Sequence, residues 1–337
     1  MALIPLAGRH EWKVRLLLAA IFTFLVIGIV IHLIPFWWMI TTSIKPPQDL
    51  FAIPPKLWPS KPTLVPWTLM FRLTSTARGM LPVPLWRYVL NSLIVVTGAM
   101  ALTLPVTSLC AYANSKLQRS RWARLWYLFF IGNLMVPPLV SLIPRVLLIH
   151  NFPWAFPEAP FIPFTNIRFP SFTMFDTLFA LFIPSAFNAG YFLYFKAYFD
   201  TIPDSVIQAA RVDGGSEFHI FRKIVLPMSL PIYAVVVWWQ FTGIWSDFMW
   251  PLLNIRTPER MPLAVALYKL QHAIVQAGNT HPAASEAMSK SVGKMLEAGL
   301  SWNGLMVLAT LETIPLILIF LFCRKYLLKG VRIRGMR

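Results

Sequence analysis

The chain has 337 residues, of which 57% are hydrophobic and 13% are charged, and its formal net charge is +17. This composition is typical of a polytopic membrane protein and excludes an ordinary soluble globular domain. A large positive net charge can indicate nucleic-acid binding. In a membrane protein it indicates basic side chains that anchor the cytoplasmic face to anionic lipid. We therefore expect membrane lipids, and no nucleic acid, as partners.

Six apolar runs predict an all-α membrane protein. Each is close to the roughly 20 residues that cross the hydrocarbon core of a bilayer. The predicted spans are residues 16–40, 88–112, 125–149, 177–199, 231–251 and 304–322. The first run has no small-residue cleavage site after it, so we interpret it as an uncleaved anchor rather than a signal peptide.

The spans divide the chain into three regions. Residues 1–15 are a cytoplasmic amino terminus, residues 16–327 a transmembrane domain, and residues 328–337 a basic cytoplasmic tail. Within the transmembrane domain we expect a cytoplasmic loop at 201–227 and an external loop at 252–303. The external loop is long for a connector, and long loops without structure of their own are usually functional or disordered.

Basic residues concentrate on one predicted side of the membrane. The short loop 114–124 holds four lysine or arginine residues and no acid, and the segment 324–337 holds six and no acid. The positive-inside rule places both segments in the cytoplasm. We therefore expect a multi-pass protein of the inner membrane with both termini, and the 201–227 loop, on the side that contains ATP.

The cytoplasmic loop between the fourth and fifth spans carries helix signals. Thr201 and Asp204 have the spacing of a capping box, and Pro203 is expected in the first helical turn. The helix should end at Gly214 and Gly215, because glycine favours the left-handed exit of a helix.

A second short helix is expected after the glycines, capped by Ser216. The side chains expected on its buried face are Phe218, Phe221, Ile224 and Val225. The small residues Ala209 and Ala210 on the first helix permit close approach of another surface. The residues alone fit two interpretations equally well: a segment that binds a recess on another protein, or an ordinary connecting loop.

Three groups of residues in this loop fall at the spacing of a known motif. Gln208-Ala209-Ala210, Asp213-Gly214 and Ile224-x-Leu226-Pro227 match EAA-x-x-x-G-x9-I-x-L-P. The loop therefore resembles the cytoplasmic coupling loop of ABC importer permeases. One departure is Gln208, which stands where that family usually has glutamate and which keeps the hydrogen-bonding capacity but not the charge.

The flanking residues resemble the carbohydrate-uptake branch of these permeases, the type of the maltose permease's smaller subunit. They are Pro203, Asn91-Ser92 and the segment 245–251, and the resemblance extends from Pro35 to Gly335. It implies a six-transmembrane-helix type I ABC importer permease fold. It also implies a second homologous permease subunit, an ABC ATPase dimer, and an extracytoplasmic solute-binding protein that contacts the 252–303 loop.

The resemblance implies that the motif residues contact the ATPase. The predicted coupling-loop residues are Gln208, Ala209, Ala210, Asp213, Gly214, Ile224, Leu226 and Pro227. Of these, Gly214 is expected to be the most sensitive, because a side chain there would clash at positive φ and at the interface.

Polar side chains at membrane depth are costly and usually face the bundle interior or a cavity. Asn188 and Gln240 are more often interhelical contacts than substrate ligands. Trp245 and Asp247 could stack on sugar rings and accept sugar hydroxyls, or the tryptophan could be an interfacial anchor. Glu312 in the last span must be protonated, paired or exposed to a translocation cavity. These five residues are the candidate substrate path.

Two rival functions remain beside sugar or oligosaccharide import. The same architecture could import glycerol 3-phosphate or another polar solute. An ion-coupled secondary transporter would use Glu312 and His32 as a proton relay and should show inverted repeats, which we do not find in the sequence.

Several catalytic motifs are absent from the sequence. Gly293-Lys294 is followed by Met295 and has no upstream glycine at P-loop spacing. There is also no H-E-x-x-H or G-x-S-x-G motif and no cluster with metal-ligand spacing. We therefore predict a transport subunit, not an enzyme, with no catalytic residue, metal or cofactor of its own; ATP and magnesium belong to the partner ATPase.

Overall fold

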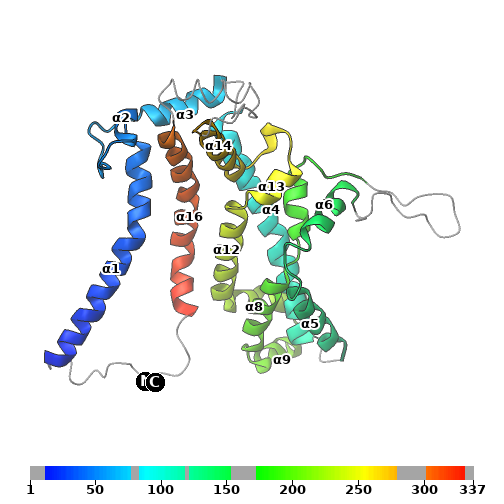
Figure 1. Ribbon diagram of the computed structural model, residues 1–337. Coiled ribbons are helices and arrows are strands. Elements are labelled where there is room, and N and C mark those ends of the chain that lie inside the picture. The colour runs from blue at the N-terminus through cyan, green and yellow to red at the C-terminus, as the bar shows by residue number, and fades with distance from the viewer. Residues whose placement is uncertain (1–11, 77–82, 118–120, 153–171, 279–300, 331–337) are drawn as a thin grey trace, which may run out of the picture. The chain divides into compact units, whose positions relative to one another are not determined.

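The computed structural model describes residues 12–76, 83–117, 121–152, 172–278 and 301–330 (Figure 1). Those residues are mostly helical, and an isolated bridge between Phe152 and Phe172 is the only β pairing among them. The expectations for the external loop at 279–300 and for the tail at 331–337 lie outside the described residues. The chain divides into two compact units, Met1–Met80 with Leu270–Thr313 and Ile333–Arg337, and Leu81–Lys269 with Ile314–Arg332.

The first unit contains three helices from the amino-terminal part of the chain. They are α1 (Trp12–Ser43), α2 (Pro47–Leu50) and α3 (Val65–Thr76). Two further helices, α14 (Leu263–Gly278) and α16 (Trp302–Gly330), each run from one unit into the other.

The second unit contains the remaining helices. Its longest member, α4 (Leu85–Tyr112), continues into the π-helical turn η1 (Ala113–Leu117). The others are α5 (Arg121–Leu134), α6 (Leu142–His150), α7 (Phe179–Phe182), η2 (Ile183–Ser185), α8 (Ala189–Asp200), α9 (Asp204–Val212), α10 (Glu217–Ile220), η3 (Phe221–Val225), α11 (Leu226–Met228), α12 (Leu230–Trp245), α13 (Met249–Asn254) and η4 (Pro258–Arg260).

Three of the described helices are long and apolar enough to cross a membrane: Val14–Ser43, Leu85–Leu117 and Trp302–Leu327. A fourth candidate is the pair Glu217–Met228 and Leu230–Trp245, whose axes are bent by 80°. The three single helices overlap the first, second and sixth predicted spans. Of the bent pair, Leu230–Trp245 overlaps the fifth predicted span, whereas Glu217–Met228 lies almost wholly in the segment predicted as the 201–227 loop. The assignment of six spans stays a prediction.

The other two predicted spans are not continuous helices. The run at 125–149 is divided into α5 and α6, with Pro137 and Pro138 in the interruption. The run at 177–199 is divided into α7, η2 and α8, and Pro184 lies in the break. Proline removes a backbone donor and disfavours helical geometry in the residue before it. Because Pro35, Pro105 and Pro315 are accommodated inside α1, α4 and α16, proline alone does not decide where a helix breaks.

Hydrogen bonds between polar residues stabilise the segment that follows the carboxyl-terminal end of α1 in the first unit. The Asp49 carboxylate accepts hydrogen bonds from Lys56 Nζ at 2.5 Å and from the Ser60 N–H and hydroxyl at 2.7 and 2.6 Å. These bonds lower the pKa of Asp49 to about 2. Lys45 is buried, lies over the Trp38 ring at 3.8 Å and donates to the Lys56 carbonyl at 2.7 Å.

The second unit is built around α4, which packs against both α8 and α12. Its buried aromatic and aliphatic core lies where α4, α8 and the 201–227 loop meet. The cluster consists of Ala111, Tyr112, Phe192, Phe195, Phe199, Ile202, Ile207, Ile220, Phe221, Val225 and Val236. In Figure 1, α9 lies at one end of this unit with α5 and α8, whereas α6 and α13 lie at the other end.

Hydrogen bonds hold that other end of the second unit together. Asn91 Nδ2 donates to the carbonyls of Glu259 and Met261 at 2.9 and 3.0 Å, and the Ser92 hydroxyl accepts from the Leu263 N–H at 2.8 Å. The family-like Asn91-Ser92 pair is therefore a structural tie between α4 and the segment after η4.

Candidate functional site

The helix α9 begins differently from the sequence prediction. The capping box of Thr201 and Asp204 is wrong, because Pro203 occupies the N-cap position and no side chain caps the helix. Thr201 Oγ1 instead donates to the Tyr198 carbonyl at 2.7 Å, at the end of α8. Threonine hydroxyls commonly bond back to a preceding turn, and that local bond competes with capping.

The predicted exit of α9 is confirmed. Gly214 has a φ of 79°, and its N–H donates to the Arg211 carbonyl at 3.0 Å. The N–H of Gly215 donates to the Ala210 carbonyl at 2.9 Å. A Cβ added to Gly215 would lie 2.8 Å from that carbonyl oxygen, whereas one added to Gly214 meets no atom within 4 Å. The steric need for Gly215 was not recognised in the sequence.

The start of the second short helix is also confirmed in part. Ser216 caps α10 by accepting from the His219 N–H at 3.3 Å. Ile220, Phe221 and Val225 are buried, and Ile224 is partly buried against the same core. Phe218, which was predicted to be buried, is 64% exposed. The buried face of α10 and η3 runs through Ile220 and Phe221, so Phe218 points away from it.

The predicted coupling residues are divided between α9 with its exit and the later segment formed by η3 and α11. Gln208, Ala209, Asp213 and Gly214 are exposed, while Ala210 is partly buried and packs against the core. Ile224 and Leu226 also pack partly against the core, and Pro227 is exposed. Apolar side chains are exposed beside them at Val206, Val212 and Phe218, and Val212 is 88% exposed. An exposed apolar patch marks a candidate interaction surface.

Two polar contacts attach α9 and α10 to α4. Arg211 Nε donates to Glu217 Oε1 at 2.6 Å, and the Tyr112 hydroxyl donates to Glu217 Oε2 at 2.8 Å. The hydrogen bond to Glu217 raises the pKa of Arg211, which stays cationic in any case. One carboxylate thus joins the end of α9 to the end of α4.

A second attachment is made by Lys116 in η1. Its ammonium group donates to Asp204 Oδ1 and to the Ile202 carbonyl, both at 2.8 Å, and its side chain is only 5% exposed. Arg211 Nη2 also donates to the Lys116 carbonyl at 3.4 Å. In the sequence, Lys116 was identified only as one of the basic residues that predict a cytoplasmic location for the 114–124 loop. Its partners lie too far along the chain for any spacing rule to reveal them.

The candidate substrate-path residues lie on several different elements of the chain. Asn188 caps α8 by accepting from the Tyr191 N–H at 3.0 Å. Gln240 and Trp245 are buried, and Trp245 stacks on Phe241 with a centroid separation of 5.6 Å. Gln240 Oε1 has no hydrogen-bond partner among the described residues. Glu312 is partly buried and belongs to the first unit.

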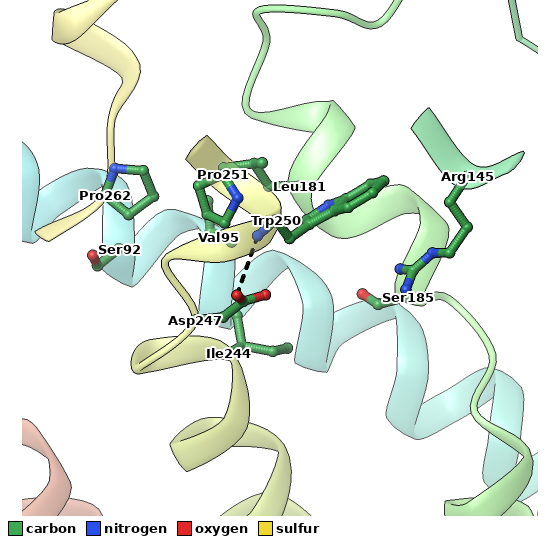
Figure 2. Close-up of a pocket in the computed structure, with 10 residues that line it drawn as sticks. All are labelled: Ser92, Val95, Arg145, Leu181, Ser185, Ile244, Asp247, Trp250, Pro251 and Pro262. Atoms are coloured by element: carbon green, nitrogen blue, oxygen red, sulfur yellow. Dashed lines mark hydrogen bonds between the residues drawn. The ribbon is translucent and has the colours of Figure 1, made fainter. Parts of the chain in front are cut away.

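Asp247 is the candidate that lines a cavity. The cavity has a volume of about 120 Å³ and lies entirely within the second unit (Figure 2). Its polar lining consists of Ser92, Ser185, Arg145 and Asp247. Arg145 was not selected from the sequence, because one arginine next to a proline has no distinguishing pattern.

Comparison with known proteins decides the family. Residues 103–333 match the family described as "Binding-protein-dependent transport system inner membrane component". The chain belongs to this family. It is accordingly an inner membrane component of a transport system.

Several relatives are named as permease proteins of uptake or transport systems. The chain is 26% identical over 232 residues to the diacetylchitobiose uptake system permease protein NgcG of Streptomyces coelicolor, covering 68% of this chain and 66% of that protein. It is 29% identical over 257 residues to a probable ABC transporter permease protein of Pyrococcus horikoshii, covering 73% and 82%. It is 25% identical over 313 residues to the sn-glycerol-3-phosphate transport system permease protein UgpE of Escherichia coli K12, covering 92% and 94%.

A solved structure supports the fold. The crystal structure of a bacterial ABC transporter involved in the import of the acidic polysaccharide alginate matches with a TM-score of 0.70 and 19% identity. The match covers 94% of this chain and 99% of that chain. The predicted fold class, an all-α ABC importer permease, is therefore confirmed, and family membership argues against the ion-coupled secondary transporter.

Proposed function

We propose that this chain is one of two homologous permease subunits of an ATP-driven importer, and that the 201–227 loop couples it to a separate ATPase dimer. The main support is the arrangement of α9. One side of this helix exposes Gln208, Ala209 and Asp213, and its ends are tied to α4 and η1 through Glu217 and Lys116. An exposed helix with rigid attachments is suited to transmit force.

The path of that force runs along α4. Tyr112 at one end of α4 bonds to Glu217, and Ser92 near the other end lines the polar cavity. A helix of twenty residues spans roughly 30 Å, the thickness of the hydrocarbon core. Closure of the ATPases on ATP and magnesium would move α9, and α4 would carry this movement to α8 and α12 as a rigid-body tilt.

The contact with the ATPase differs from the family pattern at Gln208. A neutral amide both donates and accepts hydrogen bonds, but it forms no ion pair. The exposed Val206, Val212 and Phe218 add apolar area beside it. We infer that apolar burial and neutral hydrogen bonds stabilise the contact between this loop and the ATPase.

We propose a sugar or oligosaccharide, delivered by an extracytoplasmic binding protein, as the transported solute. The relative that is named as a diacetylchitobiose uptake system permease supports this proposal. The second candidate is glycerol 3-phosphate, since the relative named for sn-glycerol 3-phosphate transport aligns over 92% of the chain. The basic segments at 114–124 and 324–337 support a topology with both termini in the cytoplasm.

Gly214 provides the test of coupling. Aspartate tolerates positive φ better than most residues, and the space around Gly214 within the chain is open. We therefore expect Gly214→Asp to insert and fold but to abolish ATP-dependent uptake, because it adds a charged side chain to the docking surface. Uptake by membrane vesicles and surface expression are the two measurements.

Gly214→Asn is the matched control. Asparagine accepts the same backbone conformation and has the same size without the charge, so it should retain more uptake than Gly214→Asp. Normal uptake by Gly214→Asp would show that this loop is not the coupling element.

A further inference from the structure

The polar cavity of the second unit is assembled from five separate segments of the chain. Ser92 and Val95 come from α4, Arg145 from α6, and Leu181 and Ser185 from α7 and η2. The remaining lining residues, Ile244, Asp247, Trp250, Pro251 and Pro262, come from α12, α13 and the connecting segments. Two of these elements, α4 and α12, are helices that the proposed transport movement would tilt.

Two opposite charges line this cavity. Arg145 and Asp247 are its only charged lining residues, so its formal charge is zero. Among the described residues, no ion pair or hydrogen bond joins them. Figure 2 shows Arg145 and Ser185 on one side, and Asp247 and Ser92 on the other. The cavity thus offers the guanidinium donors of Arg145 at one side and the carboxylate acceptor of Asp247 at the other, while the Ser185 hydroxyl already donates to the Phe182 carbonyl at 2.7 Å.

Trp250 contacts both charged residues. It is buried, its indole N–H donates to the Ala180 carbonyl at 3.2 Å, and its backbone N–H donates to Asp247 Oδ1 at 3.2 Å. The Arg145 guanidinium carbon lies 4.6 Å from the centre of the indole ring. Arg145 is therefore held by a cation–π contact, which leaves its N–H donors available to a ligand.

The size of the cavity limits what can enter it. A cavity of roughly 150 Å³ accommodates a molecule as large as benzene. At about 120 Å³, this one admits the edge of a single ring or a hydroxymethyl group, not an oligosaccharide. The rest of a larger solute would have to lie outside it.

We propose that this cavity is a subsite for a neutral, hydroxylated group of the transported solute. This inference rests on the proposed import function and specifies its substrate class. A hydroxyl can accept from Arg145 and donate to Asp247 at once, which satisfies both charged groups. A phosphate or carboxylate would satisfy Arg145 but would face the carboxylate of Asp247, and that repulsion selects against anionic solutes.

The first experiment measures binding without ATP, so that it does not depend on coupling. The chain is purified with its partner permease, and equilibrium binding of tritiated maltose, diacetylchitobiose and sn-glycerol 3-phosphate is compared. We expect the wild type to bind at least one of the neutral sugars more tightly than sn-glycerol 3-phosphate. Absence of sugar binding, or tighter binding of the phosphate, overturns the inference.

Two variants test the roles of the charges. Asp247→Asn keeps an oxygen that can accept from the Trp250 N–H, and Arg145→Gln keeps donors but removes the charge. Either should weaken sugar binding by about tenfold or more. Asp247→Asn should in addition strengthen the binding of sn-glycerol 3-phosphate, because it leaves Arg145 without an opposing charge. A purely structural role for Asp247 would produce no such change in preference.

Arg256→Gln is the matched control. Arg256 also lies over an aromatic ring, at 5.1 Å from the centre of Phe175, but it does not line the cavity. It should leave sugar binding unchanged. Unchanged sugar affinity in both Arg145→Gln and Asp247→Asn overturns the inference, whereas normal uptake by Gly214→Asp contradicts only the coupling proposal.

Discussion

Two adjacent glycines at the end of α9 have different physical roles. Gly214 is needed for its backbone conformation, with a φ of 79°, and its surroundings within the chain are open. Gly215 is needed for close approach, because the Ala210 carbonyl oxygen lies where its Cβ would be. The two glycines therefore end the helix, and Gly214 adds no side chain to the exposed surface beside α9.

This difference predicts unequal effects of substitution. Gly215→Ala places a methyl group 2.8 Å from a backbone oxygen, so the loop must shift, at a cost of about 1–3 kcal/mol. Gly214→Asn should cost less, because asparagine tolerates positive φ. Thermal unfolding of the purified protein and limited proteolysis of the loop measure both effects. Equal stability of Gly215→Ala and the wild type would contradict the close approach described here.

At the scale of the element, α4 is the organising helix of the second unit. Its amino-terminal part is bonded through Asn91 and Ser92 to the segment around Met261 and Leu263, and its carboxyl-terminal end is bonded through Tyr112 to Glu217. Side chains near both ends of α4 therefore reach backbone or carboxylate partners on other elements, as the proposed transmission of movement requires.

The hydrogen bonds of the Asn91 side-chain amide can be tested most directly. Asn91→Ala removes two donors and leaves the carbonyls of Glu259 and Met261 without them, so we expect a loss of about 1–3 kcal/mol in stability. Thr97→Ala on the same helix is the control, since the Thr97 hydroxyl bonds only to carbonyls within its own helix. Thermal unfolding in detergent compares the two, and equal losses would show that the tie is not structural.

At the scale of the whole molecule, the chain belongs to a family of transport components and has no P-loop motif in its sequence. Under the proposed function, another subunit would convert ATP hydrolysis into movement. The described part of the chain contains the exposed helix α9, the long helix α4 and a polar cavity, all within the second unit. We expect α9 to contact the ATPase and the cavity to contact the solute.

Reconstitution tests this dependence. The purified chain alone in liposomes should not accumulate solute against a gradient, with or without ATP or a proton gradient. Addition of the partner permease, the ATPase and the binding protein should make uptake depend on ATP. Uphill uptake by the chain alone, driven by a proton gradient, would instead support the secondary transporter with Glu312 and His32.

The sequence by itself determined the all-α class, the family resemblance and the residues at the surface of α9. These properties depend on local composition and on short spacings, which a helix converts directly into a shared face. It did not determine the breaks in the runs at 125–149 and 177–199, because hydropathy reports the length of an apolar run and not the continuity of its backbone hydrogen bonds.

Only the tertiary structure decided which distant residues meet. Lys116 bonds to Asp204, Tyr112 bonds to Glu217, and Arg145 and Asp247 line one cavity. Each pair combines residues from different elements of the chain, so no periodicity within one helix relates them. Their proximity is a consequence of how α4 packs with its neighbours, and packing depends on the shapes of many side chains at once.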